Sequence, residues 1–143
     1  MQLDKFTDYA LRLLMTLSVM GPQKVSSSYV AGVFDLSEHH LSKVASALVR
    51  EGFVISERGR NGGLVLARSP EDIVIGAVVR ALRGSQPVAE CFGSNTSCRI
   101  LPVCGLRNPL QKAQEAFFTT LDGYTLADIT GPHAPLRSLL TTD

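Results

Sequence analysis

The sequence predicts a mainly α-helical chain that carries one small β-hairpin. Three observations lead to this prediction. Apolar residues recur at helical spacing in several segments that begin at capping residues and end at glycine. One stretch instead places β-prone runs on both sides of an Asn-Gly dipeptide, which is a strong short-range hairpin signal. A sustained apolar stripe also lies toward the C-terminus.

The length and composition are those of one globular domain. The chain has 143 residues, of which 45% are hydrophobic and 19% are charged. The formal net charge is only +1, but Arg58, Arg60 and Arg68 form a local basic patch without an acid between them. The apolar run from Leu13 to Met20 is too short and too interrupted for a signal peptide or a membrane span. We therefore expect a cytoplasmic protein, in a reducing environment and without a membrane partner.

The first helix is predicted to begin after Asp4, its N-cap, and to end at Gly21-Pro22. Its apolar positions recur every three or four residues at Phe6, Ala10, Leu13, Leu14 and Leu17. Asp8 lies near the start of this helix and off the apolar stripe. On spacing alone, Asp8 is interpreted as a solvated acid in the first turn, where the helix dipole stabilises a negative charge.

Two short capped helices are predicted next. Residues 26–28 are three serines that can cap the first, and Ser37 caps the second, which Gly52 ends. The apolar positions of the second helix are Leu41, Val44, Ala45, Leu48 and Val49. Two such helices, of which the second exposes a polar N-terminal turn, are typical of a helix-turn-helix.

A hairpin is predicted directly after this helix pair. Residues 53–55 and 64–66 are apolar and β-prone, and residues 58–63 form a glycine-rich tip with two arginines. A hairpin in this position is the wing of a winged helix-turn-helix. The alternative is a glycine loop that cradles phosphates, but that motif has to open a helix, whereas residues 64–66 favour a strand.

Two further helices are predicted in the second half. Ser69-Pro70 begins one that runs through Ile73 to Gly84. A longer one follows, with the stripe Leu106, Leu110, Ala113, Phe117 and Leu121, and it ends at Gly123. This stripe is a larger apolar surface than one small domain can bury, so we predict that the helix packs against a second copy of the chain as a dimerisation helix. The expected division is a winged helix-turn-helix domain at 1–83, a cofactor-binding loop at 84–104, a dimerisation helix and C-terminal segment at 105–130, and a loose tail at 131–143.

All three cysteines lie in the loop between these two helices. Cys91, Cys98 and Cys104 follow the pattern C-x6-C-x5-C among Gly, Ser, Asn and Pro residues. Soft thiolates on a flexible loop suit an iron–sulfur cluster or a zinc ion. A structural zinc site normally has four Cys or His ligands, often with a close C-x2-4-C pair, which this chain lacks. Three cysteines with no metal role remain the alternative.

The predicted helix-turn-helix and wing offer candidate DNA contacts. Polar residues on the outer side of the second helix suit phosphates and major-groove edges, and arginines at the wing tip suit the minor groove of A·T tracts. The alternative is that the serines only cap helices and the lysine is an ordinary solvated charge. The two adjacent histidines point about 100° apart on a helix, so they are not a metal pair at i and i+4. The candidates are Ser28, Ser37, His39, His40, Lys43, Arg58, Arg60 and Asn61.

This combination resembles the Rrf-type transcriptional regulators, the family of NsrR, IscR and RirA, as far as about Thr130. Residues 6–9, Phe-Thr-Asp-Tyr, look like the family's N-terminus, and residues 58–63 are similar to its wing signature. The sequences around Cys91 and Cys98 and at 122–128 look most like the nitric-oxide-sensing NsrR branch.

The resemblance implies a cofactor. The three cysteines match the positions that hold an iron–sulfur cluster, [4Fe-4S] or [2Fe-2S], and Asp8 of the partner subunit matches the fourth ligand of NsrR-like proteins. Arg107 stands where IscR-like members have a histidine, which argues against that branch. His133 is a spare candidate for the fourth ligand.

The function implied is that of a homodimeric repressor. It would bind a palindromic, A·T-rich operator in double-stranded DNA, and nitric oxide would control this binding through the cluster. Two alternatives are an iron-responsive, RirA-like regulator and a cluster-free sensor that uses cysteine thiols. No enzyme is expected, because the chain lacks flavin, nicotinamide and P-loop fingerprints and has no HExxH motif.

Overall fold

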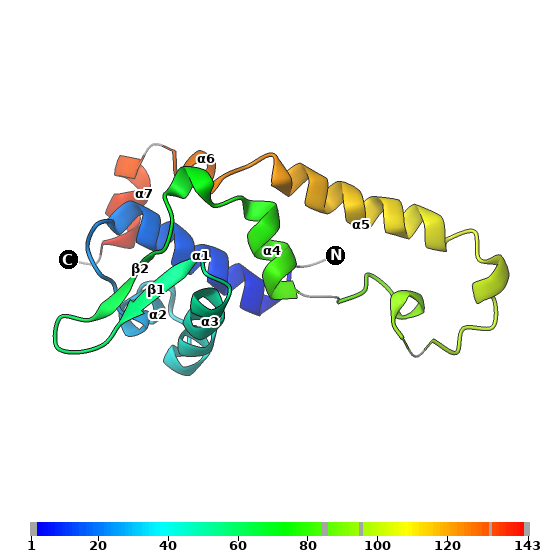
Figure 1. Cartoon of the computed structure of the whole chain (residues 1–143), viewed down its shortest axis with the longest axis horizontal. Helices are drawn as coiled ribbons and strands as arrows, with labels where there is room; N and C mark the ends of the chain where they lie inside the picture. The colour runs from blue at the N-terminus through cyan, green and yellow to red at the C-terminus, as the bar shows by residue number, and fades with distance from the viewer. Residues whose placement is uncertain (1–2, 84–85, 95, 132, 142–143) are drawn as a thin grey trace.

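The computed structural model describes residues 3–83, 86–94, 96–131 and 133–141. Figure 1 shows two parts, a helical body with the β-hairpin at one side and an arm that projects away from the body. The arm consists of the long helix α5 (Arg107–Asp122) and the irregular segment that leads into it. The predicted fold class, mainly α-helical with one hairpin, is confirmed.

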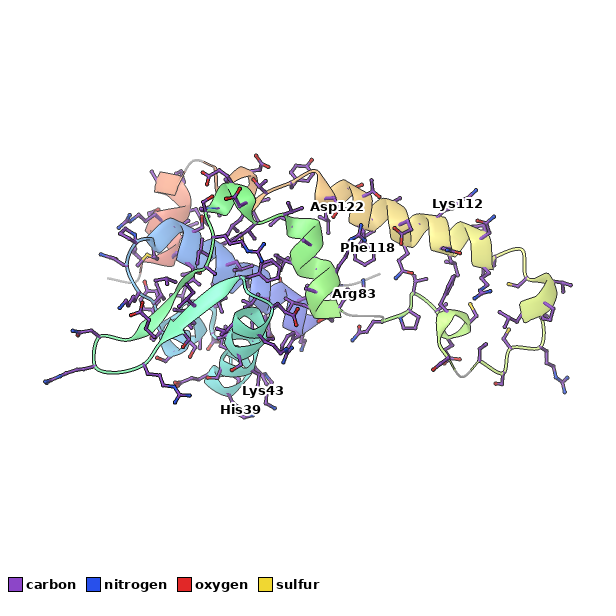
Figure 2. All side chains as sticks on the ribbon, viewed as in Figure 1. His39, Lys43, Arg83, Lys112, Phe118 and Asp122 are labelled. Carbon is purple, nitrogen blue, oxygen red and sulfur yellow. The ribbon has the colours of Figure 1, made fainter. Side chains whose placement is uncertain are left out.

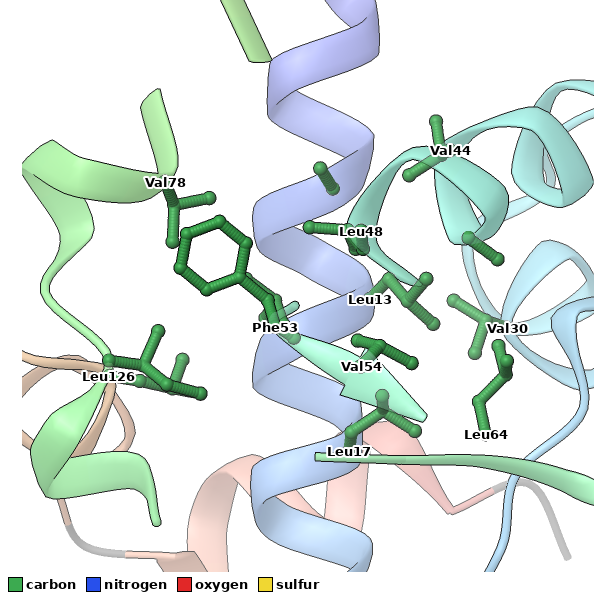
Figure 3. Close-up of a cluster of buried hydrophobic side chains, with 14 of the residues drawn as sticks. Leu13, Leu17, Val30, Val44, Leu48, Phe53, Val54, Leu64, Val78 and Leu126 are labelled. Carbon is green, nitrogen blue, oxygen red and sulfur yellow. The ribbon is translucent and has the colours of Figure 1, made fainter. Parts of the chain in front are cut away.

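Helix α1 (Lys5–Met20) runs through the middle of the body. The Asp4 side chain accepts a hydrogen bond from the Thr7 backbone N–H at 2.9 Å, which is the predicted N-cap, and Gly21 ends the helix. Leu13 is fully buried. Because elements pack on several sides of α1, it is the helix around which the body forms (Figure 3).

The helix-turn-helix consists of α2 (Ser27–Phe34) and α3 (Glu38–Arg50). Ser26 caps α2 and Ser37 caps α3, each by accepting a hydrogen bond from a backbone N–H three residues later. Asp35 ends α2 in the left-handed conformation, with φ 51°, and this turns the chain sharply into α3. The predicted caps are confirmed.

The wing is an antiparallel pair, β1 (Val54–Glu57) and β2 (Gly63–Leu66), whose register pairs Val54 with Leu66. A side chain at Gly62 would collide with the backbone of the strand that enters the tip, so the turn requires glycine there. A short antiparallel bridge between Val25 and Leu64 fastens the hairpin to the segment before α2. The predicted hairpin is therefore present and is anchored to the helix pair.

One continuous helix was predicted from Ser69-Pro70 to Gly84, and the structure differs from this prediction. Gly84 itself lies outside the described residues. A 3-10 turn, η1 (Pro70–Asp72), comes first, and α4 (Ile75–Arg83) begins only after an extended Ile73. The Ile73 carbonyl accepts from the Leu126 N–H at 2.8 Å, and the Ile75 N–H donates to the Tyr124 carbonyl at 2.9 Å. Pairing with a distant segment has replaced the local helical hydrogen bonds.

Two short helices follow α5, and the second of them takes the place of the loose tail expected from 131 onward. Helix α6 (Leu126–Thr130) begins with a capping box, in which the Thr125 N–H donates to the Asp128 carboxylate and lowers its pKa below the ordinary value. Helix α7 (His133–Leu140) then packs on α1. Leu140 is buried, and its carbonyl accepts from the Tyr29 hydroxyl at 2.7 Å.

The core is continuous from the winged helix to α6. Figure 3 shows side chains of α1 between two groups of apolar residues, one from the helix pair and hairpin and the other from α4 and α6. The body therefore includes residues well beyond the predicted winged-helix range of 1–83. The residues labelled in the figure are Leu13, Leu17, Val30, Val44, Leu48, Phe53, Val54, Leu64, Val78 and Leu126.

The base of the arm is joined to the body through close contact between α4 and α5. Arg80 on α4 pairs with Asp122 on α5, with 2.6 Å between Nη2 and Oδ2, and its guanidinium lies 4.4 Å from the centre of the Phe118 ring. Gly76 on α4 allows this approach, because a Cβ there would lie 2.8 Å from the Asp122 backbone nitrogen and would overlap its carboxylate. Figure 2 shows Phe118 and Asp122 on the side of α5 that faces α4.

We expect Gly76→Ala to lower the free energy of unfolding by about 1–3 kcal/mol, because the added methyl group must push α5 away from α4. The matched control is Gly32→Ala in α2, where an added Cβ meets nothing within 4 Å and better helix propensity stabilises by up to about 1 kcal/mol. Urea unfolding followed by circular dichroism measures both. Equal effects of the two substitutions would contradict the packing argument.

Candidate nucleic-acid interface and cysteine segment

The polar end of α3 points away from the body. Ser37 is the N-cap, and His39, His40 and Lys43 on the first turns are all exposed. Figure 2 shows His39 and Lys43 at the free end of α3. Among the described residues Lys43 forms no ion pair, so its charge is available to a polyanion. Glu38, in the first turn, is an acid on this end that the sequence-based candidates did not include.

The wing tip has the same character. Arg58, Arg60 and Asn61 are exposed, and within the described part of the chain neither arginine forms an ion pair. Gly59, with φ 107°, and Gly62 provide the backbone conformations that the tip needs. Both guanidinium groups are therefore carried on a short turn between two paired strands.

The remaining DNA candidate, Ser28, lies in the first turn of α2. It is exposed, and its hydroxyl is 2.9 Å from the hydroxyl of Ser26, the cap residue. One hollow in the surface is lined jointly by Ser27 of α2, Ser42 of α3 and Arg58 of the wing. The start of α2, helix α3 and the wing thus share one surface. Sequence reasoning missed Ser27 and Ser42, although Ser42 lies three residues from His39 and hence on the same side of the helix.

The three cysteines lie on the arm. Cys91 is in the 3-10 turn η2 (Glu90–Phe92), Cys98 is in irregular chain, and Cys104 follows η3 (Leu101–Val103). Cys98 is exposed, the other two are half-buried, and all three are free thiols.

The segment that carries the cysteines makes mainly local contacts. Its backbone hydrogen bonds join residues three apart, and the guanidinium of Arg107 at the start of α5 lies 5.3 Å from the centre of the Phe92 ring. Among the described residues from 80 to 117, none is buried. The arm therefore has no core of its own within one chain.

The structure does not bring the predicted ligands together within one chain. Among the described residues, no three Cys, His, Asp or Glu side chains lie close enough to share a metal ion. The donor set nevertheless fits a thiolate-held cofactor chemically, because three free, accessible thiols lie within fourteen residues of a segment that little else constrains. Binding would require this segment to rearrange.

Asp8 lies on α1 in the body and not beside the cysteines. Its carboxylate pairs with Arg12 one turn later, at 2.8 Å from Nη2 and 3.3 Å from Nε. Arg12 in turn stacks against the rings of Tyr9 and Phe34. The pair is only half-exposed, so the Asp8 carboxylate is oriented by Arg12 and is not a freely solvated first-turn acid. His133, the spare candidate, is the first residue of α7, and its side chain lies outside the described residues.

None of the helices in the described ranges combines the length and the apolar character needed to cross a bilayer.

Comparison with known proteins agrees with this picture. The family model Rrf2, described as an iron-dependent transcriptional regulator, matches residues 3–132. The HTH-type transcriptional regulator NsrR of Geobacillus kaustophilus is 46% identical over 98% of this chain and 97% of its own length. NsrR of Bacillus subtilis is 40% identical over the same shares.

Solved structures show the same fold. IscR of T. potens superposes with a TM-score of 0.74 at 26% identity, over 96% of this chain and 91% of its own. CymR, the global cysteine regulator of Bacillus subtilis, superposes with a TM-score of 0.71 at 28% identity, over 90% of this chain and 95% of its own. The family match at residues 3–132 spans the winged helix, the cysteine segment and α5. The chain belongs to the Rrf2 family, and it is a DNA-binding winged-helix transcriptional regulator and not an enzyme.

Proposed function

We propose that this regulator is a homodimeric repressor whose operator binding is controlled by an iron–sulfur cluster sensitive to nitric oxide. Cys91, Cys98 and Cys104 of one protomer and Asp8 of the partner subunit would hold the cluster. The operator would be a palindromic, A·T-rich duplex, because two wings related by two-fold symmetry would each present arginines to a minor groove. The observation that carries the proposal is the set of three free thiols on an arm with no core of its own.

The arm supports a dimer because it exposes apolar side chains that the described part of its own chain leaves largely uncovered. Ile100, Val103 and Leu106 are 60%, 85% and 62% exposed. They lie on the cysteine segment and at the start of α5. Packing against a second copy would bury them at about 25 cal/mol for each Å² of apolar surface removed from water. The same packing would give the cysteine segment the constraints that it lacks in one chain.

The ligand set makes one corner of the site reactive. A carboxylate is a harder and weaker ligand for iron than a thiolate. Bound there, the cluster would supply an iron atom that a small molecule such as nitric oxide can attack. Arg12 would keep the Asp8 carboxylate oriented, because it contacts both carboxylate oxygens from the next turn of α1.

The positions of these ligands link the site to the DNA-binding surface. Asp8 lies on α1, which packs directly on α3. The cysteines lie on the arm, whose base Arg80 and Asp122 fix to the body. A ligand set shared by two protomers would therefore fix the separation of the two recognition helices, and losing it would release them. The coupling free energy between cluster binding and DNA binding would equal the difference between the stabilisation that the ligand set gives to the dimer with fixed helices and to the dimer with released helices.

The cellular setting follows from the same chemistry. Free thiols that serve as metal ligands require a reducing compartment, so we place the protein in the cytoplasm. The relatives named NsrR favour nitric oxide over iron supply as the signal. A colourless protein after anaerobic purification would instead favour direct thiol sensing.

The decisive experiment is a nitric oxide titration of anaerobically purified protein, with visible absorbance and operator binding recorded together. We expect both to fall in parallel, because the residues that hold the two recognition helices apart are those that hold the cluster. A Cys98→Ala variant, which removes the most exposed thiol, should lack the chromophore and bind the operator weakly from the start. Full operator binding after the chromophore has bleached would overturn the proposal.

Asp8→Asn tests the fourth ligand. We expect the cluster absorbance to decay several-fold faster under nitric oxide or air, while the fold is retained, since a half-exposed ion pair contributes about 1 kcal/mol or less. Asp35→Asn is the matched control, because Asp35 is exposed and asparagine tolerates its left-handed conformation. Equal decay in Asp8→Asn and the wild type would remove Asp8 from the ligand set, and cluster retention by the monomer would exclude a shared site.

Lys43→Ala tests the assignment of α3 to DNA. We expect a similar loss of affinity for operator and random duplex, and a salt dependence of log K that is shallower by about 0.9, as expected for one lost phosphate contact. Lys112→Ala removes an exposed charge on the outer side of α5, far from α3, and should change neither quantity (Figure 2). Fluorescence anisotropy at several salt concentrations measures both, and an unchanged slope in Lys43→Ala would contradict the assignment.

A further inference from the structure

Two contacts outside the core join the wing to the segment before α2. The first is the backbone bridge, in which the Val25 N–H donates to the Leu64 carbonyl at 3.1 Å and the Leu64 N–H donates to the Val25 carbonyl at 2.8 Å. This bridge fastens β2, the returning strand of the hairpin. The tip, residues 58–62, projects away from the body beyond it (Figure 1).

The second contact is an ion pair between the Lys24 ammonium and the Glu57 carboxylate. Glu57 belongs to β1 and pairs in register with Gly63 of β2, and this is the last pair of the hairpin before the tip. A Cβ at Gly63 would lie 3.0 Å from the Lys24 Cβ. Lys24 therefore lies against β2 at Gly63 and reaches past it to Glu57 on β1. The bridge and the ion pair together hold both strands close to the point where the tip begins.

The ion pair lies on the face of the hairpin opposite to the one that meets α3. Ser56 and Arg58 line the hollow that the wing shares with Ser42 of α3, and its volume is about 440 Å³. Side chains alternate between the two faces of a strand, so Glu57, between Ser56 and Arg58, is directed to the other face. The pair can therefore hold the wing without occupying the surface that the wing shares with α3.

Stability alone does not account for this pair. The Lys24 side chain is 38% exposed and the Glu57 side chain 50%, and an ion pair of this exposure contributes little to the free energy of unfolding. An acid next to the wing arginines also weakens the attraction of the wing for phosphate. What the geometry of the pair provides is a restraint on the direction of the tip, because it ties the end of β1 to the segment before α2.

We propose that Lys24 and Glu57 are positioning residues for DNA binding, and that their ion pair fixes the direction of the wing so that Arg58 stays in the hollow beside α3. Neither residue contacts the duplex. Without the pair, the tip would swing about the bridge between Val25 and Leu64, and the duplex would have to immobilise it on binding, which lowers the affinity. This inference rests on the proposed role of the wing arginines in DNA binding, and it is independent of the cluster and its signal.

The sign of one substitution separates this proposal from simple electrostatics. Glu57→Met removes a negative charge near DNA, and on charge alone it would strengthen binding. We expect it instead to weaken binding about five-fold, which is the size of effect expected when one or two side chains have to be ordered on binding. Lys24→Met should weaken binding at least as much, and adding Glu57→Met to it should cause no further loss, because the pair is already broken. Glu71→Met, which removes an exposed acid that forms no ion pair with any described residue, is the matched control.

Fluorescence anisotropy of the full chain, purified anaerobically, measures binding to a duplex that the wild-type protein selects from a random-sequence library, and thermal unfolding shows that each variant keeps its fold. Unchanged or tighter binding by Glu57→Met would overturn the proposal. The exchanged pair, Lys24→Glu with Glu57→Lys, keeps the net charge and the combined length of the two side chains. It should recover most of the affinity that Lys24→Glu alone loses, and the absence of any recovery would equally count against the pair.

The same substitution without the wing arginines distinguishes positioning from a general distortion. In a protein that carries Arg58→Ala and Arg60→Ala, Glu57→Met has no arginine left to position, so we expect it to change the affinity by less than about two-fold. A five-fold loss in that background would overturn the positioning role. If the arginine variant itself binds as tightly as the wild type, the proposed wing contact fails together with this inference. If the arginine variant binds weakly and Glu57→Met binds normally, only this inference fails.

Discussion

The fold depends on the burial of one helix on several sides. Ala10, Leu13 and Leu14 form a stripe of α1 that is completely excluded from solvent, and Thr16 and Val19 are buried too, although they project from other sides of the helix. A helix of this kind has to be covered by several elements. The helix pair and the hairpin cover part of α1, and α4, α6 and α7 cover the rest. The short length of the winged helix explains why residues from the end of the chain return to the body, where they complete its core.

Local signals in the sequence predicted most of the elements, and long-range contacts account for the errors. Ser26, Ser37 and the Asn-Gly dipeptide act within four residues of themselves, so their effects can be predicted without the fold. The break at Ile73 depends on hydrogen bonds to residues about fifty positions away, and no periodicity signals it. The same holds for α7, whose proline-flanked residues become ordered because Leu140 is buried and its carbonyl meets Tyr29.

In the candidate site, too, local patterns predict some of the residues, and only the tertiary structure shows the others. The types and spacing of residues identified exposed cations on α3 and the wing, because capping and periodicity decide which side chains face water. Ser27 and Ser42 were missed, because the hollow that they line together with the wing is formed by elements far apart in the sequence. The cysteines show a different limit. Their chemistry is evident from the sequence, but the described residues of one chain bring no three Cys, His, Asp or Glu side chains together.

The tight junction at Gly76 has a mechanical consequence. Helix α5 has 16 residues and is therefore about 24 Å long, and Asp122, near its C-terminal end, meets Gly76 of α4. A tilt of about 10° at that contact displaces the cysteine end by about 4 Å, on the scale of one helical turn. Conversely, a displacement of the cysteine end would apply a torque to the contact between α5 and α4. The residues at positions 76 and 122 therefore constrain each other, since a bulkier side chain at either position would change the angle between α5 and α4.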